Sequence, residues 1–164
     1  MKFALNSHVL MAHWVPGFLV VIAIRQTLVN DYPLVYKSFI GSDDSGGAIA
    51  ILSVVVVAFI VGEVLDASRD LLEHAWDLLQ PLNWNLLFSG DKEKVENLKA
   101  SYFTYYAFDC NTSLALAIII LVLHFFTSVP AWGLAVPAVF LAILAVNAFS
   151  LRREIAKKFL DETS

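Results

Sequence analysis

The chain has 164 residues, of which 59% are hydrophobic and only 16% are charged, so it is too apolar for an ordinary soluble domain. Its length is typical of one domain, 1–164, and its formal net charge of −4 argues against a protein that binds nucleic acid. The lone Cys110 excludes an intramolecular disulfide and a zinc cluster of cysteines, and we interpret it as a small packing residue in an apolar helix.

The first apolar segment covers residues 3–24 and ends at Arg25. At about 1.5 Å per residue, a helix of this length can cross a hydrocarbon core of about 30 Å. It is too long for the apolar region of a secretory signal peptide, so we interpret it as a retained first span. Pro16 and Gly17 within it predict a kink or a close contact with another helix.

The second span is predicted at 46–63, around the uncharged stretch 48–61, which is rich in Val, Ile and Ala. It follows a segment, 26–47, that contains two loop signals made of Asn, Asp, Gly, Ser and Pro. No helix stop occurs before Pro81, so the second helix is expected to continue through Gln80, beyond the membrane.

Two further spans are predicted in the second half of the chain. A helix that Ser89 or Asp91 can cap leads into the first of them. The residues from Cys110 to Leu151 include no Asp, Glu, Lys or Arg, and this length suits two spans, 108–128 and 131–151. The turn between them is expected where the sequence reads Ser-Val-Pro-Ala-Trp-Gly, before and after Pro130.

These elements predict an all-α polytopic membrane protein with four transmembrane helices. Helices 2 and 3 are expected to extend into a cytoplasmic helical hairpin over 64–107, and 152–164 to form a cytoplasmic tail. Basic residues gather on the inner side of a membrane, which places both termini in the cytoplasm and the protein in the inner, or plasma, membrane. The outer side then holds only Arg25 and Lys37, and the inner side holds Lys2, Arg69, Lys92, Lys94, Lys99, Arg152, Arg153, Lys157 and Lys158.

Polar groups from several helices are expected to meet at the inner end of this bundle. Acidic residues recur every three or four positions over 62–77, which places them along one edge of the second helix. The third span begins and the fourth ends with polar residues at the same depth. The candidate polar site consists of Glu63, Asp66, Arg69, Asp70, Glu73, His74, Asp109, Asn111, Asn147 and Arg152.

Glu63 and Asp109 border directly on long apolar segments, where an unpaired carboxylate costs at least ~2.5 kcal/mol at mid-depth. One interpretation is a cation, proton or headgroup site that faces the bundle interior. The other is a pair of interfacial carboxylates bonded to Arg69, Arg152 or a tyrosine. A magnesium site of Glu63, Asp66 and Asp109 stays open, whereas the histidine spacings do not match a zinc-binding helix. The sequence identifies no cofactor.

Residues 69–74, Arg-Asp-Leu-Leu-Glu-His, have the form Arg, a polar residue, three variable residues and His. This pattern resembles the signature of HEPN ribonucleases, in which Arg and His assist attack of a ribose 2′-hydroxyl on the neighbouring phosphate. A small multispan protein with this pattern resembles the HEPN-motif membrane accessory proteins of RNA-targeting CRISPR systems. The resemblance implies antiviral defence and an oligomeric membrane pore. The acidic surroundings would repel RNA, so we expect a role in assembly or gating rather than in RNA cleavage.

Three functions remain open. The leading hypothesis is a homo-oligomer that forms or gates a pathway through the inner membrane, since no catalytic constellation is recognisable and small residues suit helix contacts. These small residues are Gly17, Gly46, Gly47, Ala142, Ala145 and Ala148. The alternatives are an integral membrane enzyme acting on a lipid headgroup or phosphate at the inner leaflet, and a membrane anchor. The anchor would hold a cytoplasmic protein through Trp84, Leu87 and Phe88.

Overall fold

The computed structural model describes residues 10–32, 47–79 and 102–161, and every regular element in these ranges is a helix. The all-α prediction is therefore confirmed for this part of the chain. The four long helices are α2 (Val15–Asp31), α4 (Gly47–Leu79), α7 (Thr104–Phe126) and α8 (Ala135–Asp161). Two short elements are η1, a π-helical turn at Leu10–Trp14, and η3, a 3₁₀ turn at Ala131–Leu134. The residues predicted to bind a cytoplasmic partner, Trp84, Leu87 and Phe88, lie outside the described ranges, as do Ser89 and Asp91.

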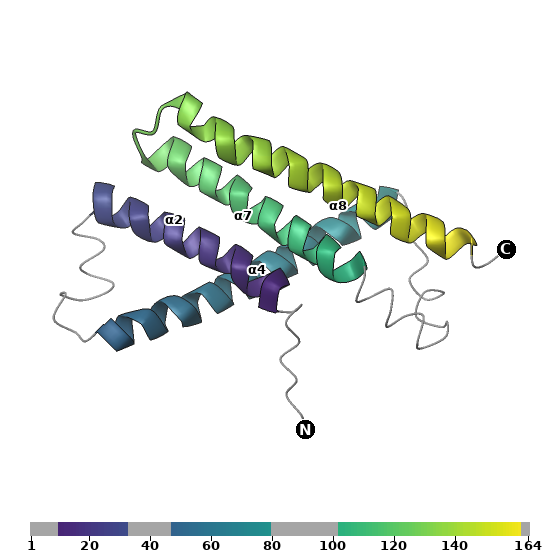
Figure 1. The fold of residues 1–164 in the computed structure, drawn as a ribbon, viewed down its shortest axis with the longest axis horizontal. Coiled ribbons are helices and arrows are strands. Elements are labelled where there is room, and N and C mark those ends of the chain that lie inside the picture. Colours follow the sequence, from purple (N-terminus) through teal and green to yellow (C-terminus); the bar gives the residue numbers. More distant parts are fainter. Residues whose placement is uncertain (1–9, 33–46, 80–101, 162–164) are drawn as a thin grey trace, which may run out of the picture.

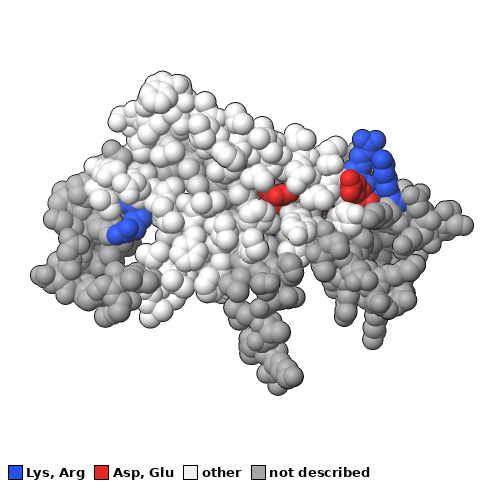
Figure 2. Space-filling model, in the orientation of Figure 1, with Lys and Arg blue, Asp and Glu red and all other residues white. Residues whose placement is uncertain are grey.

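Three stretches are long and apolar enough to cross a membrane: Met11–Asn30, Thr104–Phe126 and Ala131–Lys157. In Figure 1, α2, α7 and α8 run side by side, and α4 crosses behind them at an angle. α7 packs against α2, α4 and α8, so it is the central helix of the bundle. Figure 2 shows a face of the molecule that is mostly uncharged, as expected of helices that contact lipid.

α2 continues beyond Arg25, where we expected the first span to end, and reaches Asp31. A charged residue ends an apolar run, but it does not end a helix. The helix stops at Tyr32, which has a φ of −134° and precedes Pro33. Proline disfavours the α conformation in the residue before it, and this accounts for the observed end.

Pro16 determines how α2 begins. Because proline has no N–H, it cannot donate a hydrogen bond to the carbonyl of Ala12, four residues earlier. The turn that precedes Pro16 is the π-helical η1, and regular α-helix starts at Val15. The chain therefore changes helix type at the position where the sequence predicts a kink.

The closest contact between helices joins α2 to α4. A Cβ atom added to Gly17 would lie 2.0 Å from the carbonyl oxygen of Ala58, and one added to Gly62 would lie 2.3 Å from the carbonyl oxygen of His13. Two backbones approach this closely only where glycine leaves room for them. The prediction of a close helix contact at Gly17 is confirmed.

α4 is a single helix of 33 residues with no interruption, and it ends at Leu79, where the described range ends. At about 1.5 Å per residue it measures about 50 Å, longer than a membrane core is thick. Its first half is uncharged, and charged residues begin at Glu63. This abrupt change in composition decides where the polar groups of the protein lie.

α7 and α8 form a helical hairpin. The connection falls where the sequence predicts it: the helix ends at Phe126, and the amide of Gly133 donates to the carbonyl of Pro130 at 2.8 Å. Two small clusters of buried residues hold the bundle together. One consists of Val20, Leu65 and Ala115 from α2, α4 and α7, and the other of Tyr106, Ala148 and Ile155 from α7 and α8.

Candidate functional site

Arg69 lies at the centre of the charged half of α4 and contacts three carboxylates of its own helix. Its Nη1 is 2.6 Å from Asp66 Oδ1, its Nη2 is 2.7 Å from Asp70 Oδ1, and its Nε is 3.1 Å from Glu73 Oε1. Asp66 and Glu73 stand three residues before and four residues after Arg69, spacings that a helix brings within reach, and Asp70 is the next residue in the chain. One positive charge therefore faces three negative ones, and the group as a whole is acidic.

Asn111 of α7 connects this acidic group to the start of the first span. Its side chain is 0% exposed, and its Nδ2 donates to Asp66 Oδ1 at 3.0 Å and to the carbonyl of Ala12 at 3.0 Å. This carbonyl is the one to which Pro16 cannot donate. The Asn111 amide thus supplies the donor that Pro16 lacks, and its two hydrogen bonds join η1, α4 and α7.

His13 adds a second link between η1 and α4. Its Nδ1 lies 3.5 Å from Glu63 Oε1, and its Nε2 lies 3.9 Å from Asp66 Oδ1. The Glu63 side chain nevertheless remains 52% exposed, whereas His13 is mostly covered. Glu63 therefore points its carboxylate partly outward from the bundle.

Arg152 ties the second half of α8 to the end of α4. Its Nη2 lies 2.6 Å from Asp77 Oδ1, and its guanidinium carbon lies 5.5 Å from the centre of the Trp76 ring. The Trp76 ring in turn lies 5.5 Å from the ring of Phe149, measured between centroids. Ion pair, cation–π contact and ring contact together fix α8 against α4.

Asp109 does not join the acidic group of α4. Asn147 of α8 donates from Nδ2 to Asp109 Oδ2, so this carboxylate belongs to the interface between α7 and α8. Asp109 and Asn111 are two positions apart, and a helix turns about 200° over that distance, so they face different neighbours. The magnesium site that the sequence leaves open, Glu63 with Asp66 and Asp109, is not assembled. Within the described ranges no three His, Cys, Asp or Glu side chains are grouped to hold a metal ion.

The two ends of the HEPN-like pattern lie on different sides of α4. Arg69 is turned inward and held by carboxylates, whereas His74 is exposed. Arg69 pairs with Glu73, four residues later, in a contact that one helix makes with itself. Within one chain, then, Arg69 and His74 do not form a joint site.

At the centre of this region, burial and neighbouring charges have opposite effects on the pKa of Glu73, and likewise on the pKa of Arg69. Burial raises the pKa of Glu73, against the lowering effect of the nearby guanidinium of Arg69 and of a hydrogen bond with Tyr106. Burial alone would lower the pKa of Arg69, but Asp70, Asp66 and Glu73 more than compensate and raise it. Arg69 therefore remains a cation, whereas Glu73 takes up a proton more readily than an ordinary glutamate.

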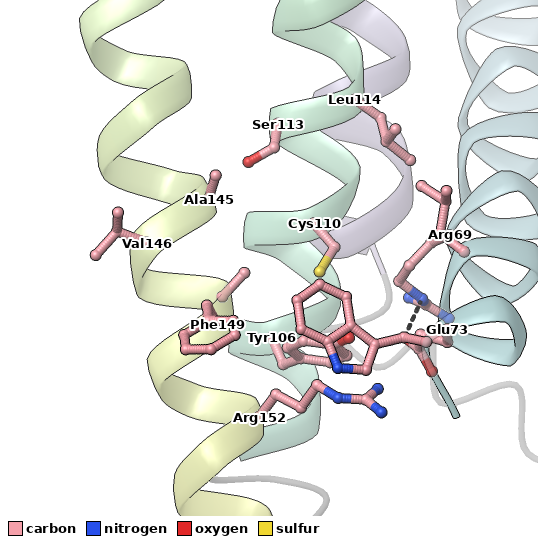
Figure 3. Close-up of a pocket in the computed structure, with 13 residues that line it drawn as sticks. Arg69, Glu73, Tyr106, Cys110, Ser113, Leu114, Ala145, Val146, Phe149 and Arg152 are labelled. Carbon is pink, nitrogen blue, oxygen red and sulfur yellow. Dashed lines mark ion pairs between the residues drawn. The ribbon is translucent and has the colours of Figure 1, made fainter. Parts of the chain in front are cut away.

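A pocket of about 510 Å³ opens between α4, α7 and α8 beside this group. Figure 3 shows Arg69, Glu73, Tyr106 and Arg152 around one part of it, with Ser113 and Leu114 farther along α7. Its lining is Arg69, Leu72, Glu73, Trp76, Tyr106, Cys110, Ser113, Leu114, Ala145, Val146, Ala148, Phe149 and Arg152. Most of these side chains are apolar, and the charged ones come from α4 and from the end of α8.

Comparison with protein-family models, with curated proteins and with solved structures found no match for this chain. The functional argument therefore depends on the geometry of the chain itself.

The sequence predicts many of the polar residues in this region but not the pocket. Trp76, Tyr106 and Phe149 line it, and none of them is in the predicted site. A signal was available for part of it: an aromatic residue near each end of a span often marks the membrane interface. What the sequence does not show is that α4 crosses the bundle so that these three side chains face one cavity.

Proposed function

We propose that this chain is a four-span protein of the inner membrane with both termini in the cytoplasm, and that copies of it assemble into a symmetric homo-oligomer that forms or gates a pathway across the membrane. Three helices have the length and apolar composition of spans. The uncharged first half of α4, residues 48–61, supports a fourth. The continuous helix beyond Glu63 supports a cytoplasmic arm, which we propose pairs with the start of the third helix as a hairpin.

The observation that carries this proposal is the exposure of Glu63 beside apolar side chains. Its side chain is 52% exposed, and its neighbours on α4, Ile60 and Val64, are 55% and 60% exposed as whole residues. A charged side chain next to lipid costs about 2.5–3.5 kcal/mol at the membrane centre and less near its surface. A water-filled path bounded by further copies would hydrate Glu63 and remove this cost, and rings of Asp or Glu favour cations.

A second feature supports association between copies. Beyond Glu63, α4 keeps four strongly exposed leucines among its charged residues: Leu71, Leu72, Leu78 and Leu79. Exposed apolar side chains grouped on a segment outside the spans are typical of a surface that contacts another protein. In a ring of identical chains, the same surface of each copy is buried against its neighbour.

The experiment is a conductance measurement on the purified full-length protein in planar bilayers, together with its mass in detergent by light scattering. We expect an oligomer and a cation-selective current. Glu63→Gln is expected to reduce cation selectivity, while the matched control Glu154→Gln, an exposed position on α8, leaves it unchanged. A monomer that passes no current at any potential contradicts the proposal, as does equal selectivity of the two variants.

The resemblance of residues 69–74 to the HEPN signature extends the proposal to antiviral defence. Because Arg69 is enclosed by carboxylates, we propose that the pattern acts in assembly or gating and not on RNA. Phage infection of cells that carry the gene with its genomic neighbours tests this role. Arg69→Gln is expected to abolish both the oligomer and the protection. His74→Ala is expected to abolish protection only if His74 meets Arg69 of another copy.

The enzymatic alternative requires a divalent cation held by Glu63, Asp66 and Asp109. Asp109 is paired with Asn147 in another interface, so no observation on the described residues favours this alternative over the pathway. Chelation that abolished a measured activity on phospholipids would revive it.

A further inference from the structure

The pocket between α4, α7 and α8 has an unused hydrogen-bond donor at its charged end. Arg152 is 8% exposed, and its Nη1 is buried without a hydrogen-bond partner, although its Nη2 contacts Asp77. Buried N–H groups of a guanidinium are almost always bonded, since an unmet donor costs free energy. In Figure 3 the Arg152 side chain extends from α8 toward Glu73, and both residues line the pocket. The guanidinium also shares a side-chain hydrogen bond with Tyr106, another residue of the lining, which leaves Nη1 as the donor without an acceptor.

The wall beyond this donor is apolar. From Tyr106 and Arg152 toward the middle of the two spans, the pocket is lined by Leu114, Ala145 and Val146. The exception is Ser113, whose Oγ is also buried without a partner. The pocket volume of about 510 Å³ falls within the range of ligand sites. A pocket of this volume and lining suits an apolar chain with a hydrogen-bond acceptor at one end.

The surrounding charges decide what kind of acceptor fits. Arg69 is already matched by Asp66, Asp70 and Glu73, and Arg152 is matched by Asp77. The carboxylates outnumber the guanidinium groups, so no positive charge is left over for a phosphate or a free carboxylate. A neutral carbonyl oxygen can still accept from Nη1, because this contact needs only a donor.

The position in the membrane identifies the source of this carbonyl. Trp76 and Tyr106 stand beside Arg152, where α7 begins and α8 leaves the apolar region, and such aromatic residues gather at the membrane interface. The pocket then extends from the interface toward the membrane centre between two candidate spans. The ester groups of phospholipids lie at the same interface, at the head of the apolar acyl chains.

We propose that this pocket binds one acyl chain of a membrane phospholipid, with the ester carbonyl of that chain accepting a hydrogen bond from Arg152 Nη1. The lipid would lie against α7 and α8 and fill the space between them and α4. The site needs only one copy of the chain, although Leu72 of its lining also belongs to the surface proposed to contact another copy.

Native mass spectrometry of the delipidated full-length protein tests the proposal, with dioleoyl phosphatidylcholine and its diether analogue as probes. The diether lipid has the same headgroup and chains but no ester carbonyl. We expect one bound diester lipid and about tenfold weaker binding of the diether, as for loss of one hydrogen bond to a charged donor. Equal binding of the two lipids, or no retained lipid, overturns the proposal.

Two variants of the same helix test the location. Ala145→Phe fills the pocket and is expected to abolish diester binding, whereas Ala138→Phe, two turns earlier on the same side of α8 and outside the lining, leaves it unchanged. Arg152→Met removes every hydrogen-bond donor of this side chain at similar length, and it is expected to bind both lipids equally. Identical behaviour of the two phenylalanine variants contradicts the site, and tighter binding of free oleate than of the diester contradicts the proposed ester contact.

Discussion

Asn111 and Asp66 form a buried link between α7 and α4: Nδ2 of the amide lies 3.0 Å from the carboxylate oxygen that Arg69 also contacts. The same amide nitrogen reaches the carbonyl of Ala12, which Pro16 cannot serve. One side chain thus satisfies acceptors on two other elements. Its removal takes this donor from the Ala12 carbonyl and leaves Asp66 Oδ1 with Arg69.

Asn111→Leu is therefore expected to destabilise the protein. A buried acceptor without a partner costs about 1–3 kcal/mol, and the hydrogen bond that Asp66 loses adds to this. The measurement is the thermal unfolding temperature in detergent micelles. The control is Ser150→Leu, which introduces the same side chain at an exposed position of α8 and is expected to change stability little. If both variants unfold at the same temperature, the link through Asn111 does not stabilise the fold.

Gly17→Ala is expected to disturb the crossing of α2 and α4. The added Cβ would lie 2.0 Å from the backbone oxygen of Ala58, which cannot move without its helix, and overpacking of this kind costs about 1–3 kcal/mol. Gly133→Ala provides the comparison, because its Cβ would meet only a side-chain methyl of Val129, at 2.9 Å. Unfolding in micelles should show a clear loss for the first variant and a small change for the second. The reverse order would contradict the described contact.

Several features of the fold follow from local sequence. The long second helix, the hairpin of α7 and α8 and the close contact at Gly17 are each set by residues within a few positions: an absent helix stop, a Pro-containing turn and a missing side chain. Gly62 carries a further sequence signal for the close contact between α2 and α4. With Ala58 it forms a pair of small residues four apart, the spacing that lets two helices approach closely.

The arrangement of the site depends on neighbours that the sequence does not display. Asp109 and Asn111 are polar residues at the start of the same helix, yet one meets Asn147 on α8 and the other meets Asp66 on α4. Only the positions of the surrounding helices decide which polar residue faces which partner. The pocket has the same origin, because it exists only where α4 crosses the hairpin of α7 and α8.

The contact between Arg152 and Asp77 is expected to couple α8 to α4 energetically. Both side chains are mostly covered, and a hydrogen bond between charged groups of this kind contributes about 1.5–3 kcal/mol. The test is a double-mutant cycle of Arg152→Gln and Asp77→Asn on unfolding in micelles. We expect the double variant to be more stable than the sum of the two single losses predicts. The control cycle combines Asp77→Asn with Arg153→Gln, a change at an exposed position of α8, and the two losses of stability should add. Additive losses in both cycles would show that the contact contributes nothing.

Glu73→Gln is expected to stabilise the protein at neutral pH, with an advantage that disappears in acid. Burial raises the pKa of Glu73, so the folded state holds this proton more tightly than the unfolded state does. The stability that this proton contributes is fully present below the unfolded pKa, about 4.3, and is lost as the pH rises through the higher folded value. Glutamine resembles the protonated form at every pH. The unfolding temperature of Glu73→Gln should therefore be close to that of the wild type at pH 4 and rise above it toward pH 8. Glu154→Gln removes an equal charge from an exposed position, and its free energy of unfolding should stay within about 0.5 kcal/mol of the wild type. A Glu73→Gln protein that is less stable than the wild type at pH 7 would mean that the attraction of Arg69 outweighs the burial of Glu73.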